Sequence, residues 1–148
     1  MPAQSTTLSP QQLTDAAKAV IIAYNEKNWT AARASITADF VYDEVATGRQ
    51  TKGIDEVVTL WQGWAAAFPD SKGTFNRALV SGNTVVLELT WKGTHKGPLQ
   101  MPKGPIAATG KSIEVRAINV FEIAGEKARM QRQYFDMTTL LQQIGATA

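Results

Sequence analysis

The order of its periodic segments constrains this chain most, because helical patterns fill the first half and strand patterns fill the second. An N-cap serine, Ser9, followed by Pro10 starts the first helix. Pro69 ends the longest one. The predicted helices cover residues 10–24, 29–36 and 54–68. Helices grouped before strands are typical of an α+β fold, with three N-terminal helices packed on one face of a curved, mostly antiparallel sheet.

The second half of the chain reads as strands separated by short turns. Alternating apolar residues and turn signals such as Gly82-Asn83 define them. The predicted strands cover residues 40–45, 74–81, 84–94, 112–123 and 129–135, and a short C-terminal helix follows over 137–144. Residues 95–109 form the one long connection, and their glycines, prolines and apolar side chains favour an ordered flap. The space between helices and sheet can hold a pocket.

Length and composition limit the classes of protein to consider. The 148 residues suit one domain over residues 9–148, preceded by a flexible arm over residues 1–8. The net charge is only +2, and the basic residues form no stripe, so we expect no nucleic-acid partner. Cysteine is absent and His95 is the single histidine, so we expect no metal site. No membrane-spanning run or signal peptide is recognised, and a cytoplasmic location is the expectation.

Asp136 lies where the last predicted strand passes into the last helix. It is a candidate general base, since perturbed acids cluster at functional sites. It is equally a candidate helix N-cap, a role in which amide hydrogen bonds and the helix dipole lower the pKa and weaken a base. An apolar wall that includes Trp61, Trp64 and Phe135 could restore basicity by desolvation. The sequence leaves both readings open.

Three further polar residues are candidates for the site. His95 either orients or protonates a carbonyl oxygen or closes a glycine-rich turn. Asn119 either bonds a developing enolate or satisfies a neighbouring backbone group. Glu44 shares a strand face with Phe40 and Tyr42 and faces inward in that register, but a slip of one residue would place it in water. We assign catalytic roles to Asp136, His95 and Asn119.

A second set of residues is expected to bind the substrate. Most are aromatic and occupy helical or strand positions that face inward, where lining a cavity and filling a core look alike in the sequence. The predicted substrate-binding residues are Tyr24, Tyr42, Glu44, Trp61, Trp64, Trp91, Gln133 and Phe135.

Three segments carry a family resemblance: residues 91–99 with Gly93-Thr94-His95-x-Gly97, residues 109–111, and residues 134–145 with Asp136-x-x-x-Leu140-Leu141-x-Gln143-x-Gly145. They are similar to the SnoaL-like polyketide cyclase group, also called ester cyclases, over residues 11–145. The order of elements resembles the cone-shaped α+β barrel shared by nuclear transport factor 2, ketosteroid isomerase, scytalone dehydratase and limonene epoxide hydrolase. The resemblance implies this fold.

The resemblance also implies a reaction. In that family an aspartate, matched here by Asp136, removes a proton from a β-keto polyketide ester, and the enolate closes a ring by an aldol step without cofactor or metal. Epoxide hydrolysis is disfavoured, because Thr90, Lys92 and Gln133 stand where the epoxide hydrolases have their water-activating triad.

Against ketosteroid isomerase, Glu44 falls near the catalytic base and Asn119 near the protonated aspartate of the oxyanion site. Val20 stands at the position of the isomerase's tyrosine. We therefore expect a cofactor-free enzyme for a hydrophobic carbonyl compound, acting by cyclisation or isomerisation. The alternative is a non-catalytic binding protein for an apolar small molecule.

Strand parity also predicts an assembly. The outward-facing positions of the last two strands include Arg116, Ile118, Val120, Met130 and Arg132. An apolar band on an exposed sheet face is unusual for a monomer. We therefore expect a homodimer that pairs sheet to sheet.

Overall fold

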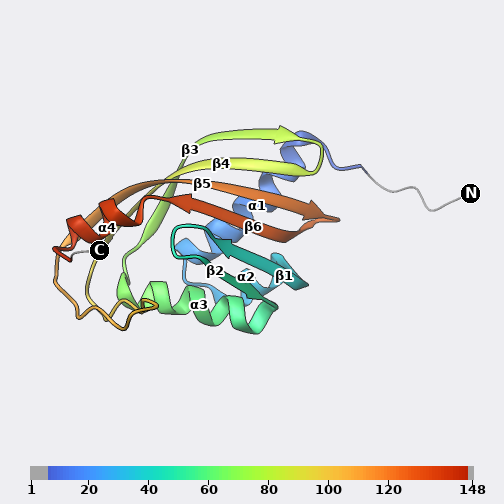
Figure 1. Cartoon of the computed structure of the whole chain (residues 1–148). Coiled ribbons are helices and arrows are strands. Elements are labelled where there is room, and N and C mark those ends of the chain that lie inside the picture. The colour runs from blue at the N-terminus through green and yellow to red at the C-terminus, as the bar shows by residue number, and fades with distance from the viewer. Residues whose placement is uncertain (1–6, 147–148) are drawn as a thin grey trace, which may run out of the picture.

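The computed structural model describes residues 7–146 as one α+β unit, with helices on one side of a six-stranded mixed sheet (Figure 1). In chain order the elements are α1 (Pro10–Asn25), α2 (Trp29–Ala34), β1 (Ile36–Glu44), β2 (Arg49–Lys52), α3 (Ile54–Ala67), β3 (Lys72–Ser81), β4 (Thr84–Thr94), β5 (Ser112–Ala124), β6 (Lys127–Phe135) and α4 (Met137–Gln143). The predicted α+β class, with helices grouped before the main sheet, is confirmed.

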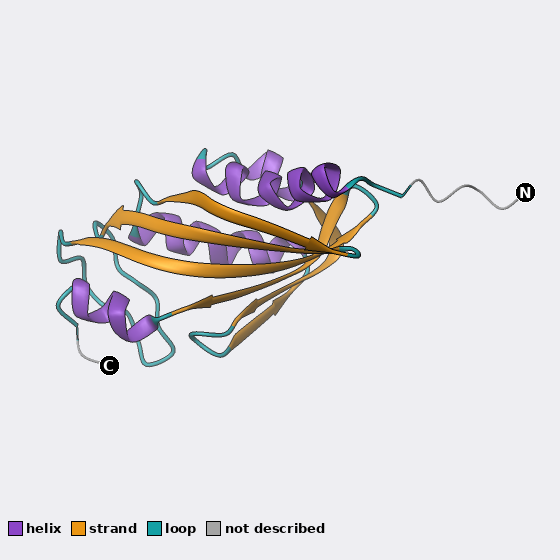
Figure 2. Ribbon diagram, turned by 90° about the horizontal axis from the view of Figure 1, so that it is seen from above, coloured by secondary structure: helices purple, strands orange, loops and turns teal. Residues whose placement is uncertain are grey.

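The sheet is curved and open, with strand order β2-β1-β6-β5-β4-β3. All neighbouring strands pair antiparallel except β1 and β6, which are parallel. Figure 2 shows α1 and α3 on the same side of this sheet. A large apolar cluster joins the two helices to β1, β4 and β5, and a smaller one lies beneath α4 and the loop that follows β4. The curvature leaves room between the helices and the sheet.

The local signals act as predicted at the start of the first helix. Ser9 caps α1 by accepting a hydrogen bond from the Gln12 backbone, while the Gln12 side chain accepts one from the Ser9 backbone. The strand parity is also as predicted: Val115, Ala117, Asn119 and Phe121 are buried, while Arg116 and Ile118 are exposed.

Three details differ from the sequence prediction. Helix α2 ends at Ala34, and β1 begins at Ile36, four residues before its predicted start, because Ile36 pairs with Ala128 of β6. The polar turn predicted between Gly48 and Gly53 contains the short edge strand β2. Residues 1–6 of the arm predicted for residues 1–8 lie outside the described residues. Leu8, in the same arm, packs against the core. The predicted domain bounds, residues 9–148, stay a prediction, because residues 147–148 lie outside the described residues.

The long loop after β4 is ordered around the C-terminal end of α3. The backbone N–H groups of Lys96 and Gly97 both donate to the Ala67 carbonyl oxygen, and Leu99 pairs with Ile106. A side chain at position 97 would overlap the Ala66 carbonyl oxygen. Glycine is therefore required where this loop crosses the helix end.

Gly97→Ala is expected to destabilise the fold by about 1–3 kcal/mol, since the added methyl group must push the loop from the helix end. Gly63→Ala is the matched control, because Gly63 lies within α3 and an added Cβ would meet nothing within 4 Å. There alanine should stabilise the helix by about 0.5–1 kcal/mol. Urea unfolding measures the stability of both variants. Equal stabilities would contradict the requirement for glycine where the loop crosses the helix end.

Candidate functional site

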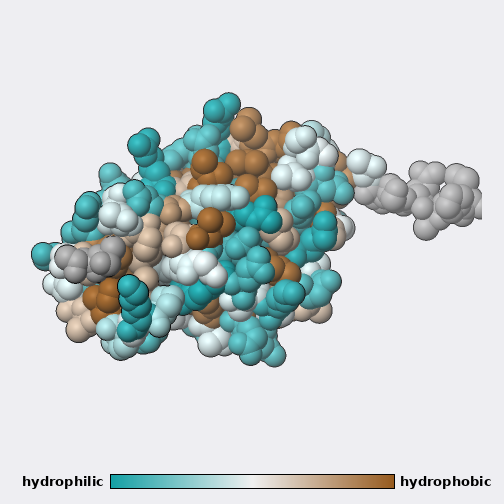
Figure 3. Space-filling view, viewed as in Figure 1, coloured by the Kyte–Doolittle hydropathy of each residue, from teal (hydrophilic) through white to brown (hydrophobic). Residues whose placement is uncertain are grey.

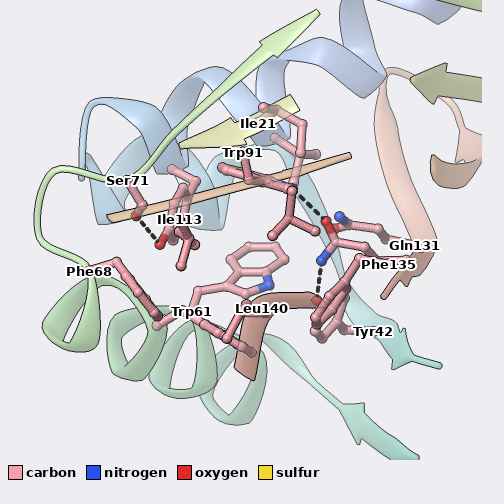
Figure 4. A pocket seen from close by; sticks show the side chains of 15 residues that line it. Ile21, Tyr42, Trp61, Phe68, Ser71, Trp91, Ile113, Gln131, Phe135 and Leu140 are labelled. Atoms are coloured by element: carbon pink, nitrogen blue, oxygen red, sulfur yellow. Dashed lines mark hydrogen bonds between the residues drawn. The ribbon is translucent and has the colours of Figure 1, made fainter. Parts of the chain in front are cut away.

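A cavity of about 80 Å³ lies between α1, α3 and the concave side of the sheet (Figure 4). A cavity needs roughly 10–15 Å³ to hold one water molecule, so this space suits a small organic molecule. Its walls are mostly aromatic and aliphatic, and its few polar groups lie at two ends. The lining residues are Val20, Ile21, Tyr24, Tyr42, Trp61, Trp64, Phe68, Ser71, Trp91, Ile113, Val115, Gln131, Gln133, Phe135 and Leu140.

A chain of side-chain hydrogen bonds forms one polar end. The Trp91 indole N–H donates to Gln133 Oε1 at 2.8 Å, and Gln133 Nε2 donates to the Tyr42 hydroxyl at 2.7 Å. Asn119 Nδ2 also donates to Gln133 Oε1, at 3.2 Å. An indole nitrogen can only donate, so it fixes which way the Gln133 amide points. The Asn119 amide is then fixed in turn.

Glu44 ends this chain as a fully buried carboxylate. Its Oε1 accepts hydrogen bonds from Thr47 and twice from Arg49, whose Nη2 lies at 2.6 Å. Its Oε2 accepts from the Tyr42 hydroxyl at 3.0 Å and from the Trp64 indole N–H at 2.9 Å. Burial, and then the Glu44 charge, raise the pKa of Tyr42 well above its usual value. Tyr42 therefore keeps its proton, which it donates to Glu44.

Gln131 was not predicted as a site residue, yet it lines the cavity beside Gln133. Its Nε2 donates to Asn119 Oδ1 at 2.7 Å, and its Oε1 has no hydrogen-bond partner among residues 7–146. The missed signal is parity, because Gln131 and Gln133 are two apart on β6 and face the same side.

The other polar end pairs a predicted residue with an unpredicted one. The hydroxyl groups of Tyr24 and Ser71 lie 2.7 Å apart, and both residues line the cavity. Burial raises the pKa of Tyr24 to about 12, against a smaller opposite effect of the Ser71 hydrogen bond. Ser71 sits in the turn between α3 and β3, where no periodic pattern indicates the side to which a side chain points.

The structure places Asp136 on the surface as the N-cap of α4 and outside the cavity wall. Its carboxylate accepts hydrogen bonds from the Thr139 hydroxyl at 2.8 Å and the Thr139 backbone N–H at 3.3 Å. These bonds lower its pKa, the hydroxyl bond most, so that the carboxyl is a weak base. The geometry therefore supports the cap, and Asp136 is not among the residues that line the cavity.

His95 is fully buried but lies behind the cavity wall, with its ring stacked on Phe68 at 5.2 Å between centroids. Its Nδ1 accepts a hydrogen bond from the Thr109 backbone N–H at 3.3 Å, and Nε2 is unpartnered in the described part of the chain. This position fits the turn-closing role, and the catalytic role assigned to His95 stays a prediction.

The structure thus divides the predicted site residues into two groups. Asp136, His95, Asn119 and Glu44 do not line the cavity, whereas the other seven do: Tyr24, Tyr42, Trp61, Trp64, Trp91, Gln133 and Phe135. Substrate binding by these seven remains a prediction. The cavity lining contains neither aspartate nor glutamate. Over residues 7–146, no three His, Asp or Glu side chains gather as a metal site, and no helix is long and apolar enough to cross a membrane.

The sequence model of the SnoaL-like polyketide cyclases matches residues 14–144 of this chain. The chain therefore belongs to the SnoaL-like polyketide cyclase family. A comparison with the curated proteins finds no match.

Solved structures share the fold at low sequence identity. A candidate SnoaL-like polyketide cyclase from Jannaschia sp. CCS1 is 15% identical, with a TM-score of 0.82 and 100% of both chains covered. Wild-type IdmH from Streptomyces antibioticus, a candidate polyketide cyclase, is 22% identical, with a TM-score of 0.76 and coverage of 91% of this chain and 99% of that one. A protein of ketosteroid isomerase-like fold from Catenulispora acidiphila, solved with trimethylamine, is 20% identical, with a TM-score of 0.75 and coverage of 89% and 93%.

Asp136→Ala is expected to lower the melting temperature, whereas Asp136→Asn, which retains a good cap, should stay close to wild type. Because the folded-state pKa is lowered, the carboxylate stabilises the fold above the ordinary value of 3.8 and loses this effect as pH falls through the lowered pKa. The gap between wild type and Asp136→Ala should therefore shrink on acidification. Thermal melts at neutral and acid pH measure it.

The two roles of Asp136 differ in activity as well as in stability. A general base would lose roughly a hundredfold to ten-thousandfold in rate in Asp136→Asn. A surface cap would lose nothing.

Proposed function

We propose that this protein binds a small hydrophobic carbonyl compound in the cavity and promotes its cofactor-free cyclisation or isomerisation. One observation carries the proposal: a cavity with aromatic walls has hydrogen-bonding groups at both ends, and the hydrogen bonds of the Trp91 end have a fixed direction. Family membership supports a cyclase-like role. The cavity volume favours a compact substrate over a long polyketide chain.

The cavity can act without a carboxylate base at the ligand. Aromatic walls that hold a flexible chain in a bent conformation bring its two reacting carbons together, and such orientation alone can supply a large share of a cyclisation rate. Exclusion of water strengthens every hydrogen bond made to the developing enolate oxygen. Substrates with an acidic proton between two carbonyl groups suit this mechanism best, because solvent can take that proton before the substrate binds, and the alkoxide formed on ring closure takes a proton from solvent as the product leaves.

A second candidate, a non-catalytic binding protein, is favoured by one observation: the lining contains neither aspartate nor glutamate. Mass spectrometry of ligand retained from expression, together with product analysis after incubation with a β-keto ester, separates the two functions. Retained ligand that never changes would favour binding.

For the enzyme, we expect Val115→Phe, which fills the cavity, to abolish product formation from the β-keto ester. Val45→Phe, the same substitution at an exposed position, should leave it intact. Product formation that survives Val115→Phe would place the reaction elsewhere.

We also propose that two copies pair through the outer face of the sheet. Leu79, Ile118 and Tyr134 are 47%, 45% and 44% exposed. Val86 pairs with Leu79 and Val120, and Ile118 pairs with Tyr134, so these residues are adjacent across four strands. Figure 3 shows apolar side chains grouped over this face.

The charges that flank the apolar group support pairing with a second copy, because they are already matched within the chain, as in Arg132–Asp43 and Arg77–Glu88. Arg116, exposed on the same face, has no ion pair among residues 7–146, so the proposed interface places it at the solvated rim. Sedimentation equilibrium at micromolar concentration should show a dimer for wild type and a monomer for Ile118→Lys. A wild-type monomer of 16.1 kDa would refute the pairing.

A further inference from the structure

A second polar cluster joins α1 to the turn before β3; the Tyr24 ring packs edge-on against the Trp91 ring at 5.3 Å between centroids, while the Tyr24 hydroxyl turns to Ser71. Lys27 Nζ donates to the Ser71 carbonyl oxygen at 2.5 Å and lies 3.4 Å from Ser71 Oγ. The same ammonium group lies 4.2 Å from the centroid of the Tyr24 ring. Figure 4 shows Ser71 and Tyr42 on opposite sides of the cavity. This cluster is independent of the chain that ends at Glu44.

The Tyr24–Ser71 pair can offer one hydroxyl hydrogen to a ligand. The hydroxyl groups of Tyr24 and Ser71 carry two hydrogens, and the bond between them uses one. Neither hydroxyl has another acceptor among residues 7–146, and Lys27 can only donate. One O–H group therefore remains free at the cavity wall, whichever hydroxyl is the donor in the shared bond.

The backbone at Lys27 gives a second, independent indication. Lys27 has φ 53°, the left-handed conformation that glycine adopts most easily. It follows the C-cap of α1, and the N–H groups of Lys27 and Asn28 donate to the carbonyl groups of Tyr24 and Ala23, as in a Schellman motif. Glycine would fit this position better for folding alone. The lysine instead places an ammonium group beside Ser71.

The neighbouring contacts hold the cluster in position. The Asn25 side chain exchanges two hydrogen bonds with the Gly73 backbone, at 2.8 and 2.9 Å, and so fixes the start of β3 against the end of α1. Burial lowers the pKa of Lys27, and the nearby Asp70 charge opposes that effect. A Tyr24 pKa of about 12 keeps its hydroxyl protonated at neutral pH. The cluster is thus a donor of hydrogen bonds with a positive charge behind it.

We propose that Tyr24 and Ser71 form a hydrogen-bond donor site for a carbonyl or enolate oxygen of the ligand, and that Lys27 is a positioning residue that adds positive potential. This inference rests on the proposed function, because it requires a ligand in the cavity. It specifies the orientation of that ligand, whose most electron-rich oxygen lies against Ser71 and not against Gln133.

The probe for this site is 4-nitrophenol, a planar compound whose single ionisable oxygen imitates an enolate and whose absorbance separates phenol from phenolate. Burial raises the pKa of a bound phenol and the donor site lowers it, so the pKa of the bound probe should be about one unit lower in wild type than in a protein without the donor site, a tenfold change in the ratio of phenolate to phenol. Tyr24→Phe, Ser71→Ala and Lys27→Gly should each raise the pKa of the bound probe by most of this amount. Lys27→Gly should also fold well, because glycine favours the left-handed backbone.

Matched controls separate the donor site from general effects of substitution. Tyr134→Phe and Lys18→Met make comparable changes away from the cavity wall and should leave the pKa of the bound probe unchanged. Val115→Phe should abolish probe binding, which locates the probe in the cavity. A wild-type protein that fails to bind the probe would overturn the proposal, as would an equal pKa of the bound probe in wild type and the three cluster variants.

The test is independent of turnover. If the probe is polarised as expected but β-keto esters yield no product, the donor site stands and the cyclisation proposal fails. If product forms while the cluster variants leave the probe pKa unchanged, the cyclisation proposal stands and the donor site fails.

Discussion

The hydrogen bond from the Trp91 indole to Gln133 sets the donor and acceptor directions on one side of the cavity. Because an indole N–H cannot accept, the bond sets the Gln133 amide, which in turn directs the Tyr42 proton toward Glu44. The bonds from Trp91 through Gln133 and Tyr42 to Glu44 hold these groups in one arrangement, whereas Gln131 Oε1, at the edge of the network, has no partner among residues 7–146. Glu44 is tolerated without solvent because Arg49, Thr47, Tyr42 and Trp64 all donate to it.

The segment from Gly93 to Gly97, at the end of β4 and the start of its loop, packs behind the cavity wall. This packing gives the family motif a structural role. Side-chain atoms at Gly93 would press on Phe68 and Ser71, and at Gly97 they would meet the end of α3. His95 fills the remaining space by stacking on Phe68. The motif therefore allows strand β4 and its loop to approach the turn that presents two cavity residues, Phe68 and Ser71.

Sequence reasoning succeeds here where a pattern has one physical meaning. Apolar periodicity places α1 and α3, and alternation gives the sidedness of β5. The four-residue strand β2 has no such pattern, and the parallel pairing of β1 with β6 depends on contacts between distant segments. Asp136 shows the same limit at the site: a base and a cap share one sequence signal, and only exposure and the Thr139 contacts separate them. Ser71 could not be predicted, because residues in a turn do not alternate between inward and outward positions as they do in a strand.

A positive charge lies beyond one polar end of the apolar cavity, and an ion pair lies beyond the other. The Lys27 ammonium group stands behind Ser71, whereas the Glu44 carboxylate behind Tyr42 is paired with Arg49 at 2.6 Å. Between them the walls are aromatic and aliphatic, so the field is screened less than it would be in water. A ligand dipole therefore has a preferred direction, with its oxygen toward Ser71. A reaction that builds negative charge on that oxygen gains from the same field, because the stabilising groups are in place before the charge develops.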